Sequence, residues 1–131
     1  MGRLNDFPVS KDFRLWEFES KDTREVRLSP DLVRKLQRLR ELLSRPVQVL
    51  SGYRTPEQNA KVGGVAGSAH LKGIAADVTW DGFEMEAAVK LAEQAGFDGI
   101  GRYPRKGFIH VDVRGYLARW VEQDFGGGGV G

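Results

Sequence analysis

Both histidines of this chain stand close to an aspartate, and the chain has no other histidine. Asp77 follows His70 by seven residues, and Asp112 follows His110 by two. Histidine is the commonest metal ligand among protein side chains, and aspartate adds an oxygen donor. We therefore expect a fold that brings two distant segments, 51–77 and 108–112, together around a metal ion.

The absence of cysteine narrows the kind of metal site. None of the 131 residues is a cysteine, so the chain has no disulfide framework, no thiolate ligand and no cysteine nucleophile, and its metal ligands must be nitrogen and oxygen atoms. The length suits one domain with a packed core. We expect a single domain over residues 1–125, with an N-terminal arm at 1–12 and a flexible glycine-rich tail at 126–131.

Charge and hydropathy exclude two classes of partner. The 20 basic and 18 acidic residues are interspersed along the chain, which argues against nucleic-acid binding. No apolar run approaches the ~20 residues of a membrane span. Residues 1–13 lack the apolar core of a signal peptide. We expect a monomer that has no membrane span and no nucleic-acid partner and is cytoplasmic as synthesised.

Three segments have the sequence patterns of helices, two of them with start signals. Ser29 precedes a proline and an aspartate, and leucines then recur every three or four residues up to Leu43, which predicts one apolar face. Residues 84–95 place methionine and alanine on one face and mostly charged residues on the other. Thr55, followed by a proline and then by Gln58, predicts a shorter helix. Residues 1–28 hold an apolar cluster that we expect to lie on the core.

Branched and apolar residues predict four strands, at 47–51, 74–79, 99–103 and 107–113. The turn at 104–106 joins the last two as a hairpin, which places His110 near the middle of a strand. The apolar residues of 116–121 predict a final helical turn that packs back onto the sheet.

The two histidine segments can supply a catalytic zinc site. Such a site has three protein ligands and leaves a fourth position for water. His70, Asp77 and His110 provide the three, and Gly73 can turn the chain so that the first two converge. Zinc lowers the pKa of its bound water towards ~7 and so provides hydroxide that attacks a carbonyl. The residues therefore predict one catalytic zinc ion and hydrolytic chemistry.

Further polar residues are candidates for the site. On a regular strand, Asp112 projects from the same face as His110, and acts either as a general base towards water or as a carboxylate that fixes the ring. The sequence leaves both roles open. Arg54 can clamp a substrate carboxylate or stabilise an oxyanion, with a plain salt bridge as its alternative. Candidate lining residues, each with an alternative role in a turn or in packing, are Tyr53, Gln58, Asn59 and Ser68.

The segment Ser68–Asp77, SAHLKGIAAD, matches the pattern S-x-H-x-x-G-x-A-x-D. With the SGYR of 51–54 and the FIHVDVR of 108–114, it resembles the zinc D-Ala-D-Ala carboxypeptidases and the related peptidoglycan endopeptidases of peptidase family M15. The resemblance is strongest to the short single-domain branch of bacteria and phages, and it extends from about residue 13 to residue 120.

This resemblance implies an α+β fold of the hedgehog/DD-peptidase type, in which helices flank a small antiparallel sheet. It implies that His70, Asp77 and His110 bind zinc, that Arg54 contacts the substrate or its developing oxyanion, and that the substrate is a peptidoglycan peptide. The chain departs from the family at Gly107, where many members carry an acidic base. Asp112 is the replacement candidate.

Two functions follow from the resemblance. The first is a zinc metallopeptidase that cuts stem peptides or cross-links of peptidoglycan, as carboxypeptidase or endopeptidase, and reaches the cell wall after release or as a phage component such as an endolysin. The second is a catalytically silent, zinc-stabilised module that binds cell wall or a protein, for example in a phage tail or lysis apparatus. Gly107 keeps the second alternative open.

Overall fold

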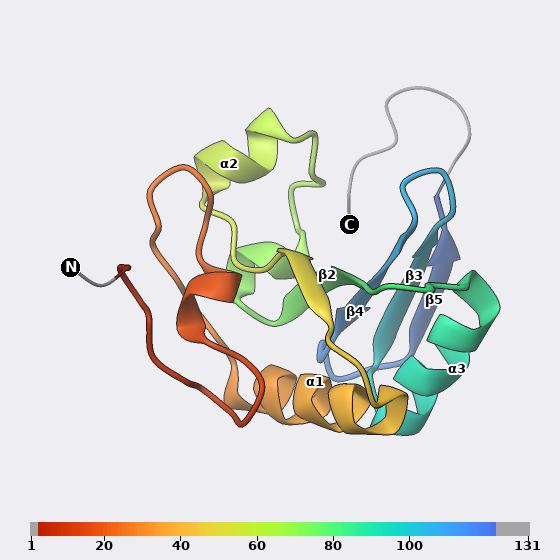
Figure 1. Ribbon diagram of the computed structural model, residues 1–131. Coiled ribbons are helices and arrows are strands. Elements are labelled where there is room, and N and C mark those ends of the chain that lie inside the picture. The colour runs from red at the N-terminus through yellow and green to blue at the C-terminus, as the bar shows by residue number, and fades with distance from the viewer. Residues whose placement is uncertain (1–2, 123–131) are drawn as a thin grey trace.

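One five-stranded sheet organises the chain. The computed structural model describes residues 3–122, so the predicted tail at 126–131 lies outside the described residues. The strands are β1 (Gln48–Ser51), β2 (Ala75–Thr79), β3 (Gly99–Tyr103), β4 (Phe108–Asp112) and β5 (Ala118–Val121), in the order β1-β2-β4-β3-β5 (Figure 1). Every neighbouring pair is antiparallel except β3 and β5. The α+β class is confirmed, and its sheet is mixed.

The helices follow the predicted start signals. Helix α1 (Pro30–Leu43) begins where the Ser29 hydroxyl accepts the amide hydrogen of Asp31, and the Thr55 hydroxyl accepts from Gln58 at the start of α2 (Pro56–Lys61). Helix α3 (Met85–Ala95) ends at Gly96, and short 3-10 turns form at η1 (Leu15–Phe18) and η2 (Ala69–Lys72). In Figure 1 helices α1 and α3 lie together, whereas α2 lies apart from them near the top.

The alternation of side chains gives the sheet two different faces. On one face, apolar residues of β2, β3 and β4 pack with α1 and α3 into a single core. Because neighbouring residues of a strand point to opposite sides, the intervening positions form the other face. That face carries Asp77, His110 and Asp112, so the sheet itself separates the core from the candidate site.

The predicted helical turn at 116–121 is wrong. Residues 118–121 form strand β5, which pairs with β3 in parallel, with Gly99 beside Ala118 and Arg102 beside Val121. A single helical turn leaves most of its backbone groups unpaired, whereas this segment satisfies backbone groups along the open edge of β3. The backbone hydrogen bonds gained by pairing with β3 therefore favour a strand over a helical turn at residues 118–121.

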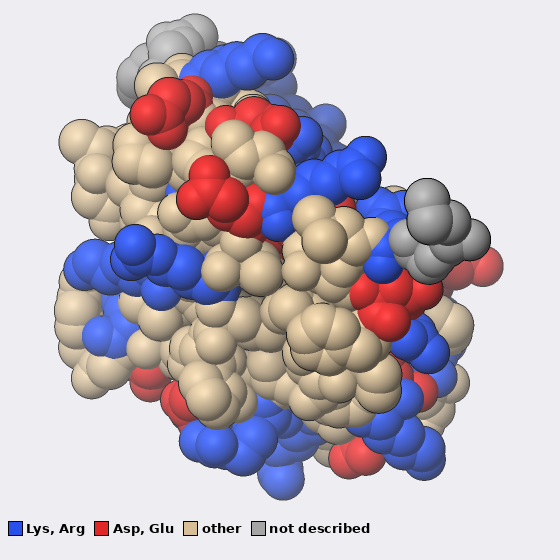
Figure 2. Space-filling view, turned by 90° about the vertical axis from the view of Figure 1, so that its left-hand side faces the viewer, with Lys and Arg blue, Asp and Glu red and all other residues tan. Residues whose placement is uncertain are grey.

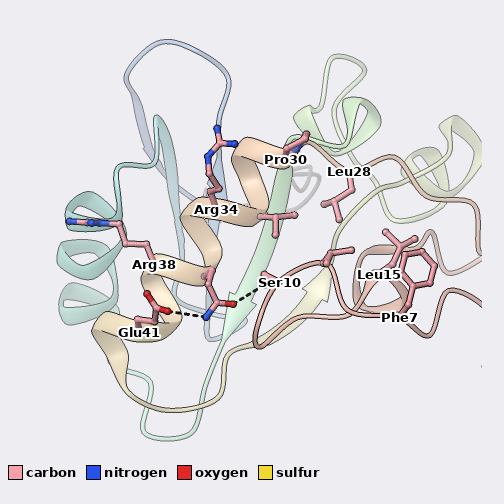
Figure 3. A pocket seen from close by; sticks show the side chains of 11 residues that line it. Phe7, Ser10, Leu15, Leu28, Pro30, Arg34, Arg38 and Glu41 are labelled. Carbon is pink, nitrogen blue, oxygen red and sulfur yellow. Dashed lines mark hydrogen bonds between the residues drawn. The ribbon is translucent and has the colours of Figure 1, made fainter.

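The N-terminal residues lie on the core, as expected. The side chains of Phe13 and Phe18 are buried. A cavity of about 630 Å³ lies between this segment and α1, with Phe7, Leu15 and Leu28 along its apolar side (Figure 3). None of its lining residues belongs to the candidate site.

Surface charge agrees with the even charge balance. On the face seen in Figure 2, basic and acidic side chains are interspersed among uncharged residues and do not form one continuous basic patch. Within residues 3–122, no helix combines the length and the apolar character that crossing a bilayer requires.

Candidate metal centre

Two adjacent strands and one turn bring the three predicted ligands together. Asp77 on β2 is the direct cross-strand partner of His110 on β4. His70 lies in η2, which ends at Gly73, whose backbone is left-handed with φ of 71°. A Cβ atom at Gly73 would stand 2.4 Å from the Arg27 carbonyl oxygen, so only glycine fits this close turn. The turn returns the chain into β2 with His70 next to Asp77.

The backbone fixes the proton of His70. Its Nδ1 lies 2.7 Å from the carbonyl oxygen of Gly52, which can only accept, so Nδ1 carries the hydrogen. Gly52 in turn is held by the N-terminal segment: a Cβ there would stand 2.7 Å from the Phe18 Cα, and the Phe18 carbonyl accepts from the Tyr53 amide at 2.8 Å. In the neutral ring, Nε2 is therefore bare: it carries no hydrogen and has a lone pair that can bind a cation. Nε2 lies 3.2 Å from Oδ1 of Asp77.

A carboxylate fixes the proton of His110 in the same way. Nε2 of His110 donates to Oδ2 of Asp112 at 2.7 Å, which leaves Nδ1 of the neutral ring bare. Nδ1 lies 3.2 Å from Oδ1 of Asp77. Among the described residues it is the one buried side-chain nitrogen or oxygen that makes no hydrogen bond. A buried polar atom without a partner is costly, so this nitrogen indicates a missing ligand.

The three lone pairs fit a metal ion. His70 Nε2, Asp77 Oδ1 and His110 Nδ1 all lie within 4.8 Å of one another. Donor atoms that bind tetrahedral zinc at ~2.0–2.1 Å are roughly 3.3–3.4 Å apart, and the two donor distances to Asp77 are 3.2 Å. Acceptor atoms that face one another this closely need a cation or a proton between them. The His-Asp-His cluster can therefore hold a metal ion.

The electrostatics of the cluster favour a bound cation. Burial alone would raise the pKa of Asp77, but the two histidines beside it hold that pKa well below its ordinary value. Burial lowers the pKa of His70, which keeps this ring neutral and able to bind a metal. Burial also opposes a charge on His110, yet the hydrogen bond with Asp112 and the negative charge of Asp77 outweigh it and raise the pKa of His110. Protons and metal ions compete for the same lone pairs, so a cluster that attracts a proton to His110 also attracts a metal cation.

Asp112 lies behind the His110 ring. Besides His110, its carboxylate accepts from Arg114, whose Nη2 is 2.6 Å from Oδ2 and whose Nε is 2.9 Å from Oδ1. Burial would raise the pKa of Asp112, but these hydrogen bonds hold it well below its ordinary value. The carboxylate is fully buried and bound to the ring nitrogen that faces away from Asp77. Of its two predicted roles, this geometry favours fixing the ring.

Glycines on β3 make room for this arrangement, and sequence reasoning missed them. Gly99 is the cross-strand partner of Asp112, and Gly101 is that of His110. A Cβ at Gly99 would stand 2.3 Å from the Asp112 carboxylate, and one at Gly101 would stand 2.4 Å from the Trp120 ring. Trp120 packs against His110, with ring centroids 4.9 Å apart. The G-x-G spacing within a predicted strand is the signal that could have found them.

The predicted substrate residues fall into two clefts. Tyr53, Arg54 and Gln58 line a cleft of about 220 Å³ together with Asp77. Ser68 lines a separate cleft of about 300 Å³, where its hydroxyl also accepts the amide hydrogen of His70 at 3.2 Å. Asn59 is buried and accepts from Arg54. Glu19, which sequence reasoning did not single out, lines the first cleft as well.

Arg54 is held beside the candidate ligand Asp77. Its Nη2 donates to Oδ2 of Asp77 at 3.2 Å, and its Nε donates to the Ser51 hydroxyl at 3.0 Å. Burial lowers the pKa of Arg54, and Asp77 opposes this shift. A buried guanidinium fixed at the edge of a cleft can bind an anionic or developing oxyanionic group. Its contact with a substrate stays a prediction.

Gly107 has the geometry of a turn residue. It joins β3 to β4 with a left-handed φ of 73°, and its carbonyl accepts from the Thr79 hydroxyl at 2.8 Å. No carboxylate therefore occupies this position, and any proton acceptor in the site must come from another element.

Comparison with known proteins gives several relatives. The chain is 36% identical over 120 residues to the peptidoglycan L,D-endopeptidase MepK of Escherichia coli K12, a match that covers 86% of this chain and 61% of that protein. It is 33% identical over 109 residues to the probable peptidoglycan L,D-endopeptidase MepK of Haemophilus influenzae Rd, covering 76% of this chain and 58% of that protein. The chain thus spans about three-fifths of the length of these relatives.

A protein-family model also matches the chain. The model for Peptidase M15 matches residues 13–112. The matched region includes the three clustered donors, the arginine beside them and the supporting carboxylate Asp112. The chain therefore belongs to the peptidase M15 family.

Proposed function

We propose that the protein is a zinc metallopeptidase that hydrolyses a peptide bond in peptidoglycan. One observation carries the proposal: the bare lone pairs of His70, Asp77 and His110 converge beside a cleft that also holds a buried arginine. Membership of a peptidase family and the names of the relatives support the choice of reaction and substrate.

Zinc is the metal that we propose for the site. Two imidazoles and one carboxylate are a donor set found in catalytic zinc sites, and three protein ligands leave a position for water. When bound, zinc supplies a water of lowered pKa and polarises the scissile carbonyl. Loss of activity with a chelator, and its return with zinc but not with magnesium, would support this choice.

The residues of the chain then have distinct tasks. Gly52 and Asp112 hold the rings of His70 and His110 so that each presents its bare nitrogen. Arg54 neutralises the second oxygen of Asp77 and is placed to orient a carbonyl or carboxylate of the peptide. We assign Asp112 to support of the ring, because its oxygens are already bound by His110 and Arg114.

For the bond that is cut, we propose an L,D bond within a cross-link, since the relatives are named for that specificity. D-Ala-D-Ala carboxypeptidase action is the alternative. Purified, zinc-loaded protein is incubated with intact sacculi, with defined cross-linked fragments and with D-Ala-D-Ala peptides, and the products are separated by chromatography and mass spectrometry. Inertness on all three substrates, with one zinc ion bound per chain, would refute the peptidase.

A catalytically silent module stays the second candidate because Gly107 removes the usual acidic base. Such a module would bind sacculi and sediment with them while releasing no new amino groups. The same incubation therefore separates the two functions, provided that bound protein and released amines are both measured.

A further inference from the structure

The cleft lined by Ser68 lies against the metal centre but takes no part in the functions assigned so far. Ser68 and Ala69 directly precede the proposed ligand His70, and Trp120, which also lines the cleft, packs on the ring of His110. We call this the Ser68 cleft. Its volume is about 300 Å³, which is enough for one amino-acid residue of a bound peptide. The remaining lining residues are Val65, Gly67, Lys72, Ile74, Arg114 and Tyr116.

The Ser68 cleft differs in charge from the cleft that contains Arg54. The Arg54 cleft is lined by two basic residues, Lys21 and Arg54, and by two acidic ones, Glu19 and Asp77. The described lining of the Ser68 cleft includes two basic residues and no acidic one. Lys72 is exposed and forms no ion pair within residues 3–122. A pocket of one charge sign raises the local concentration of ligands with the opposite charge.

Arg114 is fixed before any ligand arrives. Its Nε and Nη2 bind Asp112, and its guanidinium lies 4.9 Å from the centre of the Trp120 ring. These contacts, together with that of Tyr116, hold the planar group in one orientation at the wall of the cleft, which reduces the entropy lost on binding. The carboxylate of Asp112 is already bound by His110 and Arg114. The described lining of the cleft holds no acidic residue, so Lys72 adds a positive charge that no acidic residue of the lining balances.

We propose that the Ser68 cleft is a subsite for a free carboxylate on the peptide residue adjacent to the scissile bond. Lys72 forms an ion pair with the carboxylate and Arg114 donates to it, while Val65, Ile74 and Trp120 contact the aliphatic carbons. The inference rests on the proposed peptidase function and deepens it: the two clefts beside the metal centre bind residues on opposite sides of the bond, and one of them selects an acid.

The test uses two stem-peptide fragments that differ at one group, a free carboxylate in the first and a carboxamide in the second. Binding to the zinc-loaded chain is measured by calorimetry, and hydrolysis of the corresponding cross-linked pair is measured in parallel. We expect the acid to bind about fivefold more tightly, as for a partly exposed charge pair. Lys72→Ala removes most of this preference and raises KM for the acid with kcat unchanged, while Lys72→Arg retains it.

Lys90→Ala is the matched control, because Lys90 is an exposed lysine on α3, which packs on the opposite face of the sheet. This variant should bind both fragments as the unmodified chain does. Equal binding of acid and amide, or a Lys72→Ala variant that weakens both alike, overturns the subsite even if hydrolysis proceeds. Acid preference that depends on Lys72 without hydrolysis of any substrate keeps the subsite and refutes the peptidase.

Discussion

The two faces of the sheet are built from the same strands and are stabilised by different physics. On the helix face, Val78, Ile100 and Ile109 are buried against α1 and α3, so apolar burial holds that face together. On the site face, the buried polar groups at the alternate positions are Asp77, His110 and Asp112, which lie beside a small apolar cluster of Tyr103 and Phe108. The polar groups are stable there because each is bound by another polar group. The sheet thus separates stability from metal binding, residue by residue.

The largest expected effect lies on the site face, at the metal. His110→Ala removes one of the three proposed ligands, and we expect zinc affinity to fall by about a hundredfold or more, since structural zinc sites gain roughly 2.5–4 kcal/mol per ligand. The fold should persist, because the apolar core is unchanged and the two buried carboxylates keep their other partners, Arg54 for Asp77 and Arg114 for Asp112. Zinc titration with a competing chelator measures the first effect and circular dichroism checks the second. Unfolding of the variant would contradict the separation of the faces.

The neighbouring residue on the same strand tests the helix face. Ile109 is fully buried in the core, and Ile109→Ala should lower the free energy of unfolding by about 2–5 kcal/mol through lost burial and a residual cavity. Urea unfolding of the metal-free protein measures this. The native fraction should still bind one zinc ion with little change in affinity. A loss of affinity like that of His110→Ala would show that the two faces are coupled.

Substitution of Asp112 tests whether a residue next to the proposed ligands supports metal binding or takes part in catalysis. If Asp112 fixes the His110 ring, Asp112→Asn should weaken zinc binding by about 10–100-fold, with turnover falling in proportion to bound zinc. If it is instead a general base, zinc stays bound and kcat alone collapses. Glu19→Gln is the comparison variant, since Glu19 is a carboxylate that lines the Arg54 cleft and is not a candidate ligand. A kcat loss only in that variant would move the base to Glu19.

The smallest expected effect is on the packing of Trp120 against the sheet, where Gly101 leaves room for its ring. Gly101→Ala pushes a methyl group towards the Trp120 ring, and we expect a cost of about 1–3 kcal/mol from overpacking. Tryptophan fluorescence should change as the ring leaves His110. Gly67→Ala is the control, because a Cβ there meets nothing within 4 Å. Equal behaviour of the two variants would mean that Trp120 is not held in place by the sheet.

Much of the site could be predicted because its residues are rare and its signals are local. Two histidines in the whole chain, each followed by an aspartate, leave few other metal sites to consider. The starts of α1 and α2 depend on Ser29 and Thr55, whose hydroxyls act within three residues of themselves. The turn at Gly73 is equally local, and the structure places His70 and Asp77 together as its position indicated.

What could not be predicted depends on partners that are distant in the sequence. Strand β5 is four residues long and gains its conformation from the edge of β3, so its own sequence is ambiguous. The need for glycine at 99 and 101 arises from Asp112 and Trp120 across the sheet. Whether Asp112 faces water or the back of a ring depends on the space that Gly99 leaves for its carboxylate across the sheet, and this space cannot be read from the residues around Asp112.

The contact between the N-terminal segment and Gly52 has a consequence for metal exchange. Phe18 lies against Gly52, whose carbonyl orients His70. Local opening of residues 13–20 would therefore release the ring of this proposed zinc ligand before any strand of the sheet separates. Zinc should leave the protein at the rate of this local opening rather than at the slower rate of global unfolding. We therefore expect the early residues of the chain to set the rate at which a bound metal ion leaves.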